Sequence, residues 1–183
     1  MFDIYNIKKQ IDTPSPTQIV LLQELERFNA LLEVIQQSLV DIQRALVGEI
    51  GMSASLEQLS NDIFNGFVTP IWLNKAPNSL KNLVNWIEHF ERRYSQYKDW
   101  VEIEEPKVIW LSGLQVPESY LTALLQTTCR ARQWPLDKSL LYTEVSKERN
   151  PAKITKRLDS GTYIQGLFLE GARWSIEKDC LDY

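Results

Sequence analysis

The chain has 183 residues, of which 44% are hydrophobic and 24% charged, a composition typical of one globular domain or of two small subdomains that share a core. Twenty basic and 24 acidic residues give a net charge of −4, so the chain lacks the strong positive field that favours binding to nucleic acid or to an anionic bilayer. We therefore expect neither nucleic acid nor membrane as a partner.

A long helix is predicted from Pro16 to about Gly48 or Gly51. Ser15 can cap it, proline suits the first helical position, and Gln18 can close a capping box. Apolar residues then recur at helical spacing: Leu21, Leu25, Phe28, Leu32, Ile35, Leu39, Ile42 and Leu46. Additional apolar residues make this stripe broader than a two-stranded seam, so we favour a helix in a bundle. A coiled-coil strand formed by residues 16–47 is the alternative.

Two shorter helices follow. A second capping box at Ser55 and Gln58 predicts a helix that stops by Gly66, and apolar spacing predicts another helix from Leu80 to about Lys98. Each has one apolar side.

The pattern changes after a fourth predicted helix, which begins at Pro117 and ends near Arg132. Leu140 to Val145 and Thr162 to Leu169 are rich in aromatic or β-branched residues, and glycines bound the second segment. We interpret both segments as strands, and the C-terminal third of the chain as β-structure.

No residue is predicted to be catalytic, cofactor-binding or metal-ligating. The chain has no glycine-rich phosphate loop, and its only histidine, His89, is expected to face solvent away from other possible ligands. Glu102, Glu104 and Glu105 form an acidic patch that we interpret as a solvated loop. Carboxylate acid–base chemistry there would need burial, which the sequence does not predict.

Two further groups of residues are interpreted as ordinary features. Cys129 and Cys180 lack the spacing of a zinc or redox motif, so we expect reduced thiols. A basic run could face an acidic surface, but a mobile, soluble connection between strands is the interpretation that we favour. Its members are Lys147, Arg149, Lys153, Lys156 and Arg157.

Several stretches, in order, resemble the C-terminal domain of dynein heavy chains. They are Trp72-Leu73, Pro77 to Leu80 with Trp86, Pro106 to Leu114 (PKVIWLSGL), Pro117 to Gln126 (PESYLTALLQ) and Tyr163 to Trp174 (YIQGLFLEGARW). Each motif is weak alone, whereas the ordered combination is specific and covers nearly the whole chain. The sequences of the WLSG motif (110–113) and the GARW motif (171–174) resemble those of axonemal dyneins more than those of cytoplasmic dyneins.

The resemblance implies an α+β fold, in which a helical subdomain of about four to six helices (1–135) precedes the start of a small, incomplete antiparallel β-barrel (136–183). Family members continue into further strands, so we expect the chain to be part of a very large polypeptide. It also implies a non-catalytic domain that packs on the first and last AAA+ modules of its own heavy chain and tunes motor output. ATP and Mg²⁺ would belong to the parent motor, with no cofactor in this segment.

The other partners that the resemblance implies are further dynein subunits and, through the parent motor, the microtubule. The expected location is the cytoplasm and cytoskeleton, in the axoneme of a cilium or flagellum. An adaptor that uses the helix at 16–47 as a coiled coil is the alternative function. An enzyme with a site invisible to motif reading is the third hypothesis.

Overall fold

A computed structural model describes residues 1–148, 150–166, 173–175 and 180–182, which form six α-helices and four short strands. The helices are α1 (Ile4–Gln10), α2 (Pro16–Leu46), α3 (Ala54–Phe64), α4 (Pro70–Leu73), α5 (Leu83–Glu102) and α6 (Pro117–Arg132). The strands are β1 (Val108–Trp110), β2 (Tyr163–Gln165), β3 (Arg173–Ser175) and β4 (Cys180–Asp182). Among the helices described, none combines the length and apolar character needed to span a bilayer.

The limits of α2 are those that its sequence predicts. Ser15 and Gln18 form the capping box: the Ser15 side chain accepts from the Gln18 amide, and the Gln18 side chain accepts from the Ser15 amide. At the other end Gly48 takes a positive φ of 79°, and the amide of Glu49 donates to the carbonyl of Arg44. This is the Schellman arrangement that glycine favours, and it ends the helix.

Two other helices begin at residues different from those predicted. Ser53, not Ser55, caps α3, because the Leu56 amide donates to the Ser53 hydroxyl. Asn82 caps α5 in the same way, and this helix continues to Glu102, beyond the predicted end. The predicted fourth helix is confirmed as α6.

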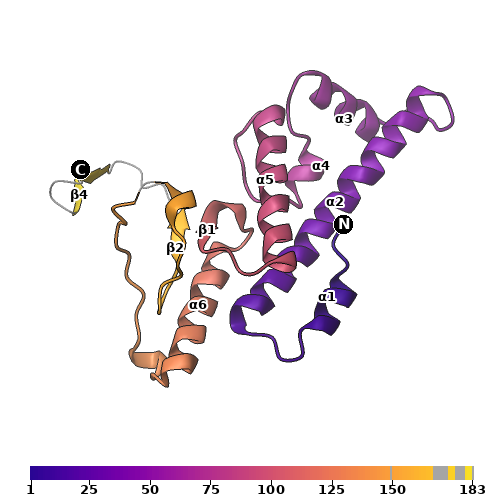
Figure 1. Ribbon diagram of the computed structural model, residues 1–183. Helices are drawn as coiled ribbons and strands as arrows, with labels where there is room; N and C mark the ends of the chain where they lie inside the picture. The colour runs from indigo at the N-terminus through magenta and orange to yellow at the C-terminus, as the bar shows by residue number, and fades with distance from the viewer. Residues whose placement is uncertain (149, 167–172, 176–179, 183) are drawn as a thin grey trace.

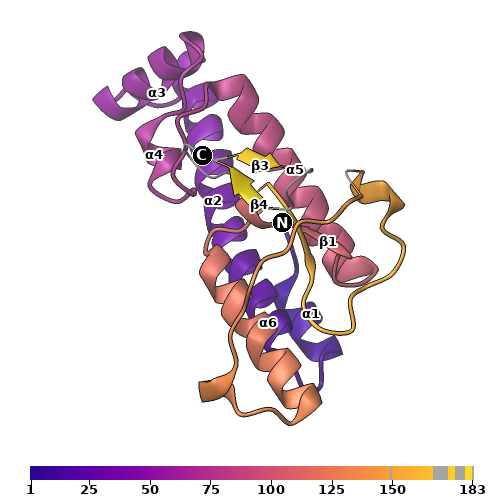
Figure 2. The ribbon, with the colours of Figure 1, turned by 90° about the vertical axis from the view of Figure 1, so that its left-hand side faces the viewer.

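The core consists of two adjoining clusters of buried side chains that share α2. Figures 1 and 2 show the arrangement of the helices that carry these side chains. The first joins the N-terminal half of α2 to α5, α6 and the β1 region, and its buried members include Leu25, Phe28 and Tyr97. The second joins Leu31 and the following turns of α2 to α3, α4 and the start of α5. Most of the apolar stripe of α2 from Leu21 to Ile42 packs within the chain, which supports the bundle interpretation over the coiled coil, whereas Leu39 and Leu46 are 44% and 67% exposed.

The predicted antiparallel β-barrel is not supported. Strand β1 pairs with β2 in parallel, with Ile109 opposite Ile164, while β3 and β4 form a separate antiparallel pair. Parallel pairing is possible because α6 and a long connection carry the polypeptide back between the two strands. The described residues form these two small sheets and no closed barrel.

The strand predicted at Leu140 to Val145 is wrong. This segment is not a strand, and Leu140 and Tyr142 are 88% and 82% exposed. In the second predicted segment only Tyr163–Gln165 forms a strand, and positions 167–169 lie outside the described residues. Strand propensity needs a neighbouring strand to become structure, and no described strand pairs with residues 140–145.

Candidate functional site

Trp110, the last residue of β1, is tightly packed against His89, Arg92, Gly113 and Gly166, and we call these five residues the Trp110 clamp. Its side chain is 4% exposed and lies 5.0 Å from the His89 ring, centroid to centroid, in a T-shaped arrangement. The Arg92 guanidinium lies 4.2 Å from the Trp110 ring centroid. A Cβ added to Gly113 or Gly166 would come within 2.4 or 2.7 Å of Trp110 carbon atoms. Both glycines are therefore required by close approach to this tryptophan.

Two polar contacts fix this clamp to its surroundings. The Gln96 side chain on α5 pairs with both backbone groups of Trp110, accepting from its amide at 2.8 Å and donating to its carbonyl at 3.3 Å. The Ser112 hydroxyl donates to the carbonyl of Gly166 at 2.8 Å. Together with the strand pairing, these bonds join the end of β2 to the helical part of the protein.

His89 is half-buried against Trp110, so the prediction that it faces solvent is only partly correct. Its pKa is lowered, first by burial and then by the positive charges of Lys81, Arg92 and Arg93. The contact with Trp110 gives this imidazole a packing role in the clamp.

Glu24 is a buried acceptor at the point where α2, α5 and the start of α6 meet. Its side chain has no exposed surface and accepts from the Tyr97 hydroxyl at 2.7 Å and from Arg27 at 2.8 Å. It also accepts from the backbone amides of Gln115 and Val116, at 2.6 and 3.2 Å. Because Val116 is the N-cap of α6, the carboxylate satisfies free amides at a helix N-terminus, where negative charge is favourable.

The buried surroundings of Glu24 shift the pKa values of two polar neighbours. Burial, followed by the nearby carboxylate, raises the pKa of Tyr97 far above its ordinary value, so this hydroxyl remains a donor. Burial also lowers the pKa of Arg93, which Glu24 partly opposes. The network thus couples the charge of one carboxylate to several elements of the core.

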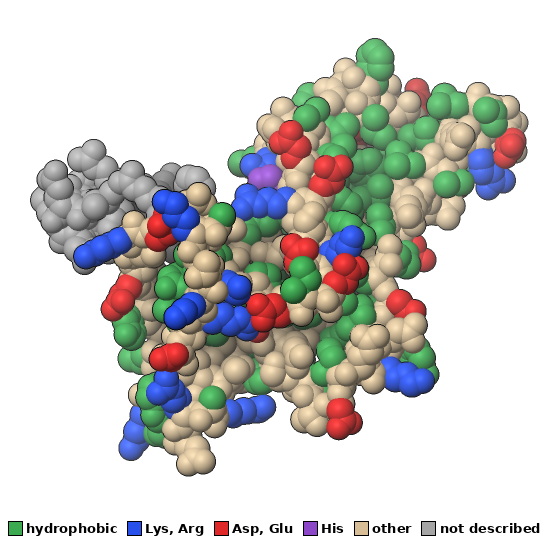
Figure 3. Space-filling view, in the orientation of Figure 1, with side chains coloured by type: hydrophobic (Ala, Val, Ile, Leu, Met, Phe, Trp, Pro, Cys, Tyr) green, Lys and Arg blue, Asp and Glu red, His purple; other side chains and the backbone are tan. Residues whose placement is uncertain are grey.

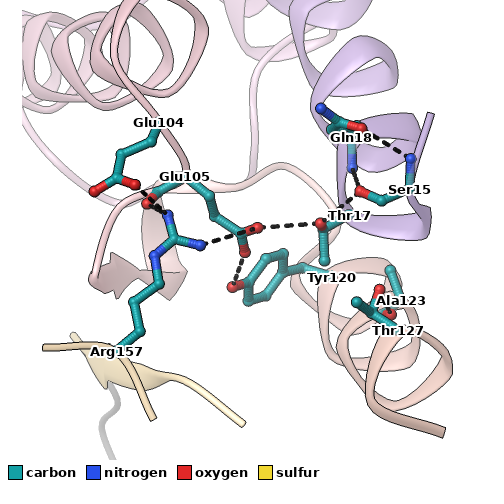
Figure 4. A network of polar contacts seen from close by, with 9 residues as sticks. All are labelled: Ser15, Thr17, Gln18, Glu104, Glu105, Tyr120, Ala123, Thr127 and Arg157. Atoms are coloured by element: carbon teal, nitrogen blue, oxygen red, sulfur yellow. Dashed lines mark hydrogen bonds and ion pairs between the residues drawn. The ribbon is translucent and has the colours of Figure 1, made fainter. Parts of the chain in front are cut away.

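Glu105 organises a second polar network, shown in Figure 4. It accepts from the Tyr120 hydroxyl of α6 at 2.7 Å and from the Thr17 hydroxyl of α2 at 3.1 Å. Arg157 approaches from the β2 side: it donates to the Glu105 carbonyl and lies 3.7 Å from a Glu104 carboxylate oxygen. The interpretation of this acidic patch as a solvated loop is therefore wrong for Glu105.

The same network corrects the interpretation of the basic run for one member. Arg157 joins the connection before β2 to the end of α5, whereas Lys147, Lys153 and Lys156 are exposed, as a solvated connection requires. Arg149 lies outside the described residues. Of the two cysteines, Cys129 is a buried free thiol, and the side chain of Cys180 lies outside the described part.

The surface offers candidate contact areas. A shallow cavity of about 370 Å³ lies between α2 and α6, and it is lined by mixed polar and apolar side chains, Pro16 and Arg130 among them.

Over residues 1–148, 150–166, 173–175 and 180–182, no three His, Cys, Asp or Glu side chains lie close enough to hold a metal ion. The absence of catalytic and cofactor-binding residues stays a prediction.

Large apolar side chains are exposed at one end of the helical body. In Figure 3, hydrophobic side chains gather over α3, α4 and the adjoining part of α2, and Lys and Arg are more frequent on the side of β2 and α6. We define the α3–α5 face as four exposed apolar residues at the end of α3, in the loop after it and around the start of α5. They are Phe64 (89% exposed), Phe67 (62%), Leu80 (107%) and Val84 (64%).

The described residues therefore form a helical body, joined internally by two carboxylate networks, with large apolar side chains left at its surface. The protein belongs to the family formed by the C-terminal domain of dynein heavy chains, whose model matches residues 1–183. This confirms the resemblance found in the motifs.

The relatives are axonemal. The chain is 53% identical over 180 residues to the dynein-1-alpha heavy chain of the flagellar inner arm I1 complex of Chlamydomonas reinhardtii, and 50% identical over 182 residues to human dynein axonemal heavy chain 10. The alignments cover 98% and 99% of this chain but 4% of each relative. The expected axonemal type is therefore confirmed, and the chain spans a small part of the length of these relatives.

Proposed function

We propose that this chain is the C-terminal domain of an axonemal dynein heavy chain that packs on the AAA+ ring of the same polypeptide. There it braces the ring, through the first and last modules, and tunes the output of an ATP-driven microtubule motor. Nucleotide and Mg²⁺ bind to the ring modules and not to this domain. Its location is the axoneme of a cilium or flagellum, where other dynein subunits are further partners.

The observation that carries the proposal is the family match over the whole chain, at 50% identity or more to two axonemal heavy chains. The geometry supports a bracing role in two ways. Buried Glu24 and the Glu105 network link helices that are far apart in the sequence, which favours a rigid body. The exposed phenylalanines of the α3–α5 face supply apolar area for packing against another domain.

The experiment uses an axonemal heavy chain and a variant that lacks this domain. The purified domain, shown to be folded by a cooperative melt in circular dichroism, is added back to the shortened motor. We expect saturable binding and a change in the microtubule-stimulated ATPase rate toward that of the intact motor. No binding, together with identical ATPase rates for the intact and shortened motors, would overturn the proposal.

The non-catalytic part of the proposal has its own measurement. A ligand that binds only the folded state raises the melting temperature of a protein. Because we propose that this domain does not bind nucleotide, Mg-ATP should leave the melting temperature of the purified domain unchanged. A saturable rise in melting temperature with Mg-ATP would assign a nucleotide site to this domain and contradict that part.

A further inference from the structure

The four residues of the α3–α5 face lie around one hydrogen bond that joins two segments. The amide of Leu83 donates to the carbonyl of Gly66 at 2.8 Å, which holds the loop after α3 against the start of α5. Phe67 and Val84 each adjoin one partner of this bond in the sequence. This bond therefore brings together the two segments that carry the four exposed side chains.

The end of α3 explains why Phe67 lacks an apolar partner nearby in the sequence. Gly66 has a φ of 75°, and the Phe67 amide donates to the carbonyl of Asp62, so the helix ends in a Schellman motif. In such motifs the residue at the place of Phe67 often packs on a side chain one turn back. Here those positions hold Asn61 and Asp62, and the phenylalanine ring stays 62% exposed.

Unpaired polar atoms in the same region are a second observation. The Thr69 hydroxyl and one carboxylate oxygen of Asp62 are buried, and neither has a hydrogen-bond partner in the described part of the protein. Buried polar atoms are normally paired, so two unpaired oxygens make this loop a place where the domain is less well stabilised by its own contacts.

We propose that the α3–α5 face is the surface by which this domain docks on the rest of its own heavy chain, against an apolar area of that polypeptide. The inference rests on the proposed function and adds the face that makes the contact. The 183 residues align with only 4% of the length of each relative, so most of such a heavy chain is tethered to this domain. A tethered surface is present at high effective concentration, which favours it over a separate protein of equal affinity.

The test places a photoreactive phenylalanine analogue at Phe67 of the intact, active heavy chain. Tyr5 is the matched control, because it is also an aromatic residue, 75% exposed, and lies on α1 at the other end of the helical body (Figure 1). After irradiation, mass spectrometry identifies the crosslinked peptides. We expect position 67 to crosslink to heavy-chain peptides outside residues 1–183, with a yield at least tenfold above that of position 5.

The other outcomes overturn the inference and are distinguishable. Crosslinks from position 5 but not from position 67 to the rest of the heavy chain would show docking by another face and leave the proposed function intact. An absence of crosslinks to the rest of the heavy chain from either position would count against both. Crosslinks from position 67 to a separate polypeptide, or to a second copy of the heavy chain, would assign the face to that partner instead.

A substitution gives an independent measurement in the intact heavy chain. Phe67→Ser changes a side chain that is 62% exposed within the domain. We expect amide hydrogen exchange over residues 64–84 to become at least tenfold faster, with α6 unchanged. Tyr5→Ser is the control and should leave residues 64–84 unaffected. Equal exchange over 64–84 in Phe67→Ser and the unmodified protein would overturn the inference.

Discussion

Removal of the buried carboxylate of Glu24 should be among the most damaging single changes in this domain. Glu24→Ala leaves the Tyr97 hydroxyl and the amides of Gln115 and Val116 without their acceptor. It also removes a negative charge that offsets the buried guanidinium of Arg93. Breaking a buried charged network by removing one partner costs about 3–5 kcal/mol in the free energy of unfolding. For a protein of this length, that is a fall of about 6–20 °C in melting temperature.

The assay is urea unfolding followed by far-ultraviolet circular dichroism, with Glu26→Ala as the matched control. Glu26 is also on α2, but its side chain is 51% exposed and it pairs with Lys8 at the surface, so its loss should cost less than about 1 kcal/mol. Glu24→Gln separates charge from hydrogen bonding: it keeps one acceptor oxygen, and we expect a smaller loss than for alanine. Equal stabilities of the Glu24→Ala and Glu26→Ala variants would refute this account of the core.

Three further predictions concern the clamp and the two networks. Gly113→Ala should destabilise the domain by about 1–3 kcal/mol in urea unfolding, because the added Cβ would lie 2.4 Å from a Trp110 carbon. Gly51→Ala is the control and should leave the free energy of unfolding unchanged, because a Cβ there has nothing within 4 Å. Equal losses of stability in the two variants would contradict the tight packing around Trp110. The pKa values of Tyr97 and Tyr120 are raised in the folded protein, so above pH 10 these tyrosines lose their protons more readily in the unfolded chain. The stability that the two neutral hydroxyls contribute is therefore complete below pH 10, and the free energy of unfolding falls above it by about 1.4 kcal/mol per pH unit for each tyrosine. Unfolding titrations should therefore show a steeper decline above pH 10 for the unmodified protein than for the variant with both tyrosines changed to Phe, and parallel curves would argue against the assignment. Arg157→Ala should cost less than about 1 kcal/mol because its ion pairs are partly exposed, and a loss above about 2 kcal/mol would show a larger role for this contact.

The features that sequence predicts well are local. The start of α2 follows from hydrogen bonds between Ser15 and Gln18, which lie three positions apart, and its end follows from the backbone freedom of Gly48. The start of α3 shows the limit of such signals: both Ser53 and Ser55 can cap a helix, and only Ser55 has glutamine three positions later. The helix nevertheless begins at the earlier serine.

The features that sequence misses depend on distant partners. Strand β1 has three residues and pairs with a strand more than 50 positions later, so neither its existence nor its parallel direction has a local signal. Glu24 does carry a signal, because it lies between Leu21 and Phe28 at helical spacing, on the face that the apolar pattern assigns to the core. A charged residue on such a face needs buried partners. Glu105 has no comparable signal, since it precedes Pro106 in a charged loop.

The pairing of Gln96 with the backbone of Trp110 also decides how the small parallel sheet can grow. A carboxamide that accepts from one amide and donates to the carbonyl of the same residue occupies the backbone groups that a third strand would use beside β1. On that side α5 closes the sheet with a side chain instead of a strand. Any strand added to this sheet, from a later part of the polypeptide or from another protein, must therefore join at the outer edge of β2.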